Sequence, residues 1–165
     1  DYLSVKKRNA SGNANRAHVA AELMDKGYVS SIREAFETLL GEQHGFYVPP
    51  VRLKTVDAIR FLRKIHAVPV LAHPLQELEP LALRQMLPEA IEAGLMGIET
   101  MHASYDAATI ATATQIAEAY HLLPSGGSDF HGSNKPDISL GIGKGNLCIP
   151  LSFYQNLLQA HRSLQ

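Results

Sequence analysis

The sequence lacks most of the features that mark secreted, membrane-bound or disulfide-stabilised proteins. Its single cysteine, Cys148, excludes an intramolecular disulfide and a cysteine-based zinc cluster, and it fits a reducing compartment. No apolar run approaches the roughly 20 residues that a bilayer span requires. Residues 1–8 also lack the order of charge followed by an apolar core that identifies a signal peptide. We therefore expect a cytoplasmic protein with no membrane partner.

An excess of charge of one sign is also missing. The 15 Lys and Arg residues nearly balance the 16 Asp and Glu residues, and the formal net charge is −1. No general basic field attracts nucleic acid, so any polyanion must be held by a local site. Apolar residues make up 45% of the 165 residues, which is enough for a compact core. The eight histidines are the unusual count, because imidazoles bind metal ions wherever several converge.

The first fifty residues predict a small helical region. Residues 6–13 are polar and lack periodicity, so residues 1–13 are interpreted as a flexible lead-in. Asn15 is placed to cap a first helix, and Ser31-Ile32-Arg33-Glu34 has the form of a capping box that opens a second. The segment Phe46-Tyr47-Val48-Pro49-Pro50 cannot continue a helix and indicates a linker.

From residue 55 the sequence alternates between helical spacing and short apolar runs. Repeated helix and buried strand is typical of a parallel sheet covered by helices, so the predicted fold class is α/β. The predicted helices are 55–66, 79–93, 106–120 and 152–163, and the predicted strands are 68–72, 97–101, 122–123 leading into 125–128, and 147–149.

Polar residues follow the predicted strands at the point where each one ends. His73 follows the first strand, Gly97-Ile98 of the second runs into Glu99, and Asp129 and His131 follow the third. Because the carboxyl ends of parallel strands meet at one edge, these side chains are expected to share a rim.

Each of these residues has a functional and a structural interpretation. Asp129 and His131 alternate on an extended segment, and carboxylate with imidazole is a common ligand pair for a divalent metal. The alternative is a turn that Asp129 caps, with His131 in solvent. His73 before Pro74 is either a metal ligand or a hydrogen-bonded structural residue. Glu99 is either a base that supports a ligand or the partner of a basic residue.

Arg16 and His18 stand at the start of the first predicted helix. Free backbone amides and the positive end of the helix dipole favour a phosphate there, and arginine adds a bidentate donor. The competing interpretation is an ordinary solvated helix start.

Five segments in this order resemble the PHP family of metal-dependent phosphoesterases. The resemblance is greatest to its bacterial RNA 5′-end nucleases and nucleoside 3′,5′-bisphosphate phosphatases. The segments are Asn15-Arg16-Ala17-His18-Val19-Ala20, Tyr47-Val48-Pro49, Leu71-Ala72-His73-Pro74, Gly97-Ile98-Glu99 and Gly126-Gly127-Ser128-Asp129-Phe130-His131-Gly132.

The resemblance implies a fold and a set of site residues. The fold is the C-terminal part of a distorted parallel β/α barrel, TIM-like, formed by residues 51–165, with residues 14–50 as a small helical insertion over the active site. The implied cofactors are divalent metal ions, with Mn first and Zn or Fe as alternatives. The implied metal ligands are His73, Asp129 and His131, and the implied substrate-binding residues are Arg16, His18 and Glu99.

Two departures from the family pattern affect the predicted activity. Asn15 and Ala17 replace a glycine and a proline of the insertion motif, and no His-x-His metal motif precedes Asn15. We therefore expect a fragment of an enzyme that hydrolyses phosphoester bonds in nucleotides or at RNA 5′ ends through metal-activated water. The isolated chain is expected to be inactive and to form homo-oligomers through open sheet edges. The alternatives are a barrel-type amidohydrolase and a noncatalytic module that binds phosphorylated ligands.

Overall fold

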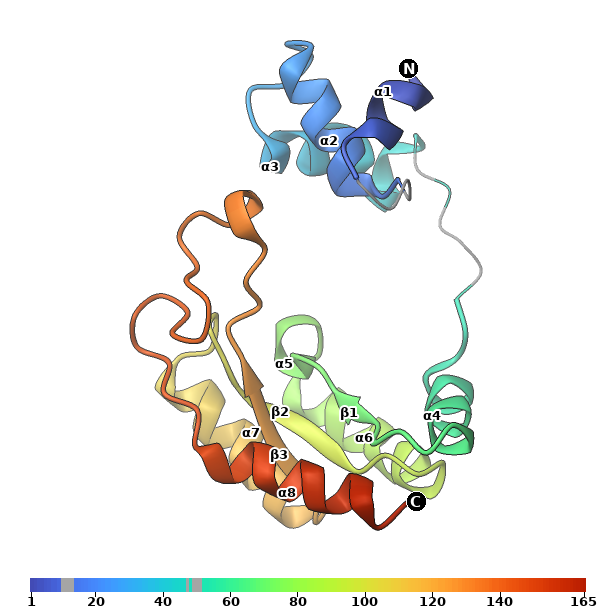
Figure 1. The fold of residues 1–165 in the computed structure, drawn as a ribbon, viewed down its shortest axis with the longest axis vertical. Helices are drawn as coiled ribbons and strands as arrows, with labels where there is room; N and C mark the ends of the chain where they lie inside the picture. The colour runs from blue at the N-terminus through green and yellow to red at the C-terminus, as the bar shows by residue number, and fades with distance from the viewer. Residues whose placement is uncertain (10–13, 47, 49–51) are drawn as a thin grey trace. The chain divides into compact units, whose positions relative to one another are not determined.

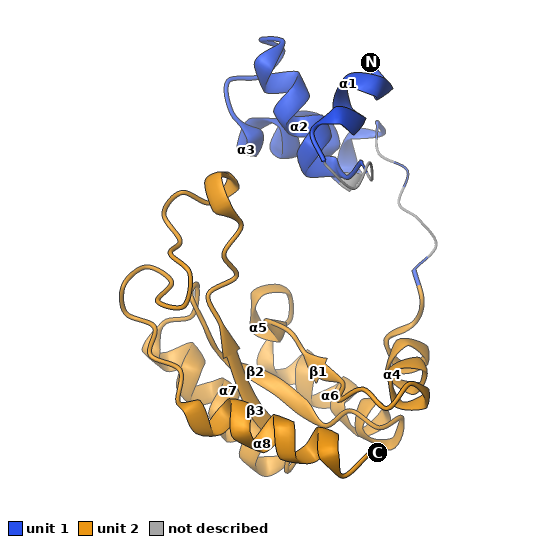
Figure 2. Cartoon of the chain, in the orientation of Figure 1, with its two compact units in different colours: residues 1–52 blue, residues 53–165 orange. Residues whose placement is uncertain are grey.

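The computed structural model describes residues 1–9, 14–46, 48 and 52–165, and they form two compact units (Figure 2). The first unit is Asp1–Arg52 and the second is Leu53–Gln165. The predicted linker at 46–50 lies largely outside the described residues, as do residues 10–13 of the predicted lead-in. The predicted role of residues 14–50 as an insertion over the active site stays a prediction.

The chain begins with a helix, α1 (Tyr2–Lys7), which corrects the prediction of a flexible lead-in. A carboxylate oxygen of Asp1 accepts a hydrogen bond from the Leu3 N–H at 3.0 Å and caps the helix. Val5 is the buried residue of this helix, and one apolar contact is too little to produce a recognisable sequence period. Arg8 ties the segment to the next helix through ion pairs with Glu22 at 2.8 Å and Asp25 at 2.5 Å.

Both predicted helix starts of the first unit are present. Asn15 caps α2 (Arg16–Asp25), and Ser31 Oγ accepts from the Glu34 N–H at 3.0 Å to cap α3 (Ile32–Ala35). The second half of the predicted capping box differs, because the Glu34 carboxylate accepts from the N–H of Ser30 and not from Ser31. The helical path continues through η1 (Phe36–Leu40) and η2 (Glu42–His44) around a small core of Ala20, Val29, Ala35 and Leu40.

The second unit is an α/β structure built on a parallel sheet, which confirms the predicted fold class (Figure 1). Its three strands run in the order β1 (Val70–Leu71), β2 (Gly97–His102) and β3 (Leu123–Gly127). Its helices are α4 (Thr55–Lys64), α5 (Pro74–Glu77), α6 (Pro80–Glu92), α7 (Ala107–Ala119), the short η3 (Gly132–Asn134) and α8 (Leu151–Arg162).

The strand predicted at 147–149 is wrong, because these residues are described without strand structure. Leu147 is nevertheless buried, and Ile149 packs so closely on Gly126 that a Cβ there would lie 3.0 Å from its Cγ1. The apolar side chains therefore serve packing against the sheet without adding a strand to it.

Two histidines without a predicted function terminate helices. His66 after α4 and His121 after α7 have positive φ angles of 57° and 54°. The chain reverses there, and the Leu122 N–H donates back to the Ala117 carbonyl at 2.9 Å. These turns lead the chain from each helix directly toward the next strand.

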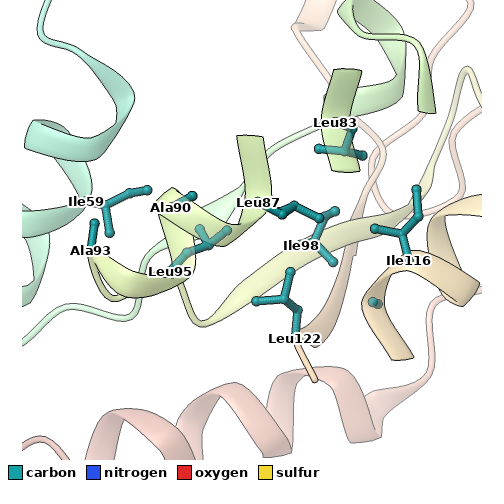
Figure 3. Close-up of a cluster of buried hydrophobic side chains, with 10 residues drawn as sticks. Ile59, Leu83, Leu87, Ala90, Ala93, Leu95, Ile98, Ile116 and Leu122 are labelled. Atoms are coloured by element: carbon teal, nitrogen blue, oxygen red, sulfur yellow. The ribbon is translucent and has the colours of Figure 1, made fainter. Parts of the chain in front are cut away.

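The core of the second unit lies between the sheet and its helices (Figure 3). Ile98 of β2 is completely buried, and it meets Leu83 and Leu87 of α6 and Ile116 of α7. This packing fixes the strands as a rigid base for the loops that follow their carboxyl ends. Among the described residues, no helix has the length and apolar character needed to cross a bilayer.

Candidate functional site at the carboxyl ends of the strands

His73, which follows β1, meets Glu99, which lies inside β2. His73 directly precedes α5 and has a left-handed backbone with φ of 32°. Its backbone N–H donates to Glu99 Oε2 at 2.6 Å, so the carboxylate holds the turn that carries the imidazole. A Cβ added to Gly127 of β3 would lie 3.0 Å from Glu99 Oε1, so the third strand also limits where this carboxylate lies.

His102 occupies the centre of the site and is only 3% exposed. Its ring lies between those of His73 and Tyr105, with centroids 5.6 and 5.4 Å away. The Ser104 N–H donates to His102 Nδ1 at 3.1 Å, so in the neutral ring the proton resides on Nε2. Burial lowers the pKa of His102, against the opposing effect of the Glu99 and Asp129 carboxylates.

Asp129 lies after β3, and its carboxylate reaches the side chain of His102. Its Oδ2 lies 3.7 Å from His102 Nε2 and accepts a hydrogen bond from the Lys135 ammonium. His131 lies beside it, with Nδ1 2.7 Å from the Asp129 carbonyl oxygen and 3.6 Å from Oδ1. Burial disfavours the ionised form of Asp129, but Lys135 and the two histidines outweigh it and lower its pKa.

The backbone at Asp129 is unusual, with a positive φ of 52°. An aspartate adopts this left-handed region more readily than most residues, because its short side chain forms local hydrogen bonds. The turn aims the carboxylate toward His102 and allows Lys135 to contact it.

The donor chemistry fits a divalent metal ion, but the described side chains do not complete a metal site. His73, Asp129 and His131 offer imidazole nitrogens and carboxylate oxygens, the ligands expected for Mn, Zn or Fe. In the described part of the chain, however, no three His, Cys, Asp or Glu side chains form a group able to hold an ion. The described residues alone therefore leave the coordination shell of such an ion incomplete.

Arg16 and His18 belong to the first unit, where local contacts engage both. The Arg16 guanidinium lies 5.6 Å from the centre of the Phe36 ring and donates to the Leu40 carbonyl at 3.4 Å. His18 Nδ1 accepts from the Asn15 N–H at 3.2 Å and completes the helix cap. That these two residues face a substrate phosphate remains a prediction.

The sequence analysis assigns no role to His102, Lys135 or Gln76. His102 ends β2 three residues after Glu99, and the extra residue of a β-bulge between Glu99 and Met101 changes which side chains face the site. Lys135 lies in a loop with no periodicity, so nothing in its spacing indicates a contact with Asp129. Gln76 Nε2 lies 3.0 Å from His102 Nδ1 and reaches it from α5.

Comparison with known proteins identifies a sequence relative over part of the chain. No family model matches. Over 76 residues the chain is 40% identical to phosphoribosyl 1,2-cyclic phosphate 1,2-diphosphodiesterase from Eggerthella lenta, and the match spans 46% of this chain. It covers 28% of the length of that relative.

Two solved structures share the fold over 97% of the chain. One is a protein from Bifidobacterium adolescentis named as a metal-dependent phosphoesterase, with a TM-score of 0.79 and 25% identity. The other is an amidohydrolase from Chromobacterium violaceum with bound sulfate, with a TM-score of 0.77 and 22% identity. The chain spans 56% of the length of each. The sequence relative and the neighbour from Bifidobacterium adolescentis confirm the predicted resemblance to PHP-type phosphoesterases. Both solved structures share the fold, which fits the predicted α/β partial barrel.

Proposed function

We propose that this chain is the C-terminal part of a metal-dependent phosphoesterase, a hydrolase that cleaves phosphodiester bonds. The observation that carries the proposal is the convergence of His73, Glu99, His102 and Asp129 at the carboxyl ends of three parallel strands. The sequence relative, whose name describes the cleavage of a cyclic phosphodiester, supports this reaction class.

The proposed substrate is a phosphorylated nucleotide or an RNA 5′ end, consistent with a nuclease or a nucleotide phosphatase. The name of the relative from Eggerthella lenta contains a ribose that carries phosphate esters. The proposed substrates also carry a phosphate ester on ribose. In this proposal Arg16, His18 and Glu99 contact the substrate. Arg16 supplies a guanidinium that pairs with two phosphate oxygens at once.

The proposed cofactor is a divalent metal ion, with Mn the first candidate. When bound, such an ion lowers the pKa of a coordinated water and neutralises charge on the phosphate. His73, Asp129 and His131 are the residues of this chain proposed to hold it. Glu99 holds the backbone of His73, and the buried His102 packs between His73 and Tyr105, so both maintain the geometry of the first ligand.

The isolated chain of 165 residues is proposed to be inactive. Its described side chains contain no group of three that could hold a metal ion, so an ion bound by this chain alone depends on water to fill its shell. Appreciable turnover then needs ligands that the described residues do not contain.

The test compares ligand variants of the whole product of the gene that encodes this chain. Substrates are a ribose 1,2-cyclic phosphate and a nucleoside 3′,5′-bisphosphate, with an N-acyl amino acid as the amidohydrolase control. Asp129→Asn and His131→Ala are expected to lower kcat about 100-fold or more, because loss of even a supporting residue costs 10- to 100-fold. Bound metal should fall in parallel, and the melting temperature should change little.

Asp137→Asn serves as the matched control, because it removes a carboxylate from the same exposed loop. Wild-type turnover and wild-type metal content in both ligand variants would contradict the assignment. Cleavage of the amide alone would favour an amidohydrolase. The similarity to the amidohydrolase from Chromobacterium violaceum, at 22% identity, supports a shared fold only. Binding of a bisphosphate that a chelator leaves unchanged, without turnover, would favour a noncatalytic module.

A further inference from the structure

Lys135 brings a positively charged group to the rim of the candidate site. Its ammonium group donates a hydrogen bond to Asp129 Oδ2, the oxygen that lies 3.7 Å from His102 Nε2. Burial is the main cause that lowers the pKa of His102, and the charge of Lys135 acts in the same direction. The ammonium therefore lies within electrostatic reach of the strand ends, where the proposed hydrolysis takes place.

The loop after β3 fixes the position of Lys135. The backbone N–H of Lys135 donates to the Gly132 carbonyl at 3.2 Å, and its carbonyl accepts from the Ile138 N–H at 3.1 Å. Ile138 is buried, so the loop is anchored just beyond the lysine. Binding a ligand normally costs a lysine much of its side-chain freedom. Here the turn and the hydrogen bond to Asp129 restrict that freedom beforehand.

Asp129 uses only part of the hydrogen-bonding capacity of the ammonium. A lysine ammonium carries three N–H donors and no acceptor, and the contact with Asp129 Oδ2 takes one of these donors. The side chain is 42% exposed, so the other donors are open to water and to a ligand. Phosphate oxygens accept strong, charge-assisted hydrogen bonds from an ammonium. A phosphate at this rim replaces water without breaking the pair with Asp129.

We propose that Lys135 binds a phosphate group of the substrate at the rim of the site, through the donors that Asp129 leaves unused. The inference deepens the proposed function and rests on it, because a phosphorylated substrate brings the phosphate to this rim. The contact joins the ammonium directly to phosphate oxygens.

The experiment measures binding of adenosine 3′,5′-bisphosphate to the full chain by amide chemical-shift titration at constant ionic strength. A chelator is present, so that traces of divalent cations do not carry the phosphate. Lys135→Met removes the charge and keeps the aliphatic stem, whereas Lys135→Arg keeps the charge. Lys144→Met is the matched control, because it removes the same charge from an exposed position of the same long loop. Adenosine is the probe without phosphate, and the amide spectra report that each variant folds.

Lys135→Met is expected to weaken binding of the bisphosphate about three- to tenfold, the range for one partly exposed charged hydrogen bond. Lys135→Arg and Lys144→Met should bind within about twofold of wild type, because each keeps a cation beside Asp129. Asp129→Asn should bind more tightly, since its amide oxygen still accepts from the ammonium while a charge that repels phosphate is removed.

Wild-type affinity in Lys135→Met, an equal loss in Lys144→Met, or no saturable binding by the wild-type chain would overturn the inference. Weaker binding in Asp129→Asn, or adenosine binding as tightly as the bisphosphate, would also overturn it. The proposed function has its own assay on the whole gene product. Turnover of a phosphoester there, with wild-type affinity in Lys135→Met, would reject this role of Lys135 and leave the proposed function standing. An absence of turnover would reject the proposed function, and the titration would still decide whether Lys135 binds phosphate.

Discussion

At the scale of single residues, Gly127 controls how closely β3 approaches the Glu99 carboxylate. A methyl group at this position would lie 3.0 Å from Glu99 Oε1, a contact that forces the carboxylate to shift by a few tenths of an ångström. Gly127→Ala is therefore expected to weaken the bond from the His73 N–H to Glu99 Oε2. Amide hydrogen exchange of His73 should accelerate about fivefold, as for the loss of roughly 1 kcal/mol of hydrogen bonding.

Glu99→Gln provides the comparison, because it keeps one oxygen acceptor and should accelerate the exchange less than Glu99→Ala. Exchange at the wild-type rate in Gly127→Ala would show that Glu99 relocates without losing its bond to His73.

The residues of the site were predictable to the extent that they end strands. His73 and Asp129 follow from the rule that parallel strands present their carboxyl ends together, whereas Glu99 lies inside β2. His102 and Lys135 did not follow, because a β-bulge and an aperiodic loop place them. Hydrogen-bond geometry in three dimensions decides such positions, and sequence spacing does not carry it.

At the scale of elements, α7 is stabilised by its N-cap residue, Asp106, which directly precedes the helix. A carboxylate oxygen of Asp106 accepts from the Thr109 N–H at 2.7 Å, and this hydrogen bond lowers the pKa of Asp106. Because the pKa of Asp106 is lower in the folded than in the unfolded chain, its ionised carboxylate stabilises the fold. This stabilisation is complete at pH values above the pKa of the unfolded chain, and it is lost as the pH falls through the pKa of the folded chain. Asp106→Ala is expected to lower the melting temperature by a few degrees at neutral pH, and the difference should shrink in acid, below the usual aspartate pKa of about 4.

Thermal melts monitored by circular dichroism across this pH range test the cap. Asp106→Asn is the control, since an amide oxygen caps at every pH and its difference from Asp106→Ala should persist in acid. A pH-independent gap between wild type and Asp106→Ala would mean that the carboxylate charge contributes nothing to the cap.

Most helices and strands of the second unit were predictable from periodicity, with ends that shift by one or two residues. The errors have a common cause. Residues 147–149 are apolar because they pack on the sheet, and α1 is helical because Asp1 caps it and Arg8 anchors it. In both segments a tertiary contact decides the structure, and a short window of sequence does not reveal such contacts.

At the scale of the whole molecule, the helices of the second unit expose large apolar side chains. Phe61 of α4 and Ile65, directly after it, are 58% and 57% exposed, and Leu151 and Tyr154 of α8 are 69% and 62% exposed. Among the described strands, β1 pairs only with β2, so one of its edges has no strand partner. Each Å² of apolar surface removed from water contributes about 25 cal/mol, which favours covering these surfaces.

We therefore predict that the chain self-associates at micromolar concentration, which light scattering measures directly. Phe61→Ser with Ile65→Ser should shift the population toward monomer, and Arg60→Ser on the same helix should not. A monodisperse species of 18.0 kDa for the wild-type chain would contradict the prediction.

The left-handed backbone at His73 and Asp129 lowers the stability of the fold at two residues that the proposed function requires. Both residues hold positive φ angles, which cost a side-chain-bearing residue roughly 1 kcal/mol relative to glycine. Glycine at either position would relax the turn and remove the proposed ligand in the same step. His73→Gly is thus expected to melt at a higher temperature than His73→Ala while binding metal no better. On backbone conformation alone glycine would suit both positions better, so the side chains of His73 and Asp129 carry a cost in stability that a role in the proposed site would offset.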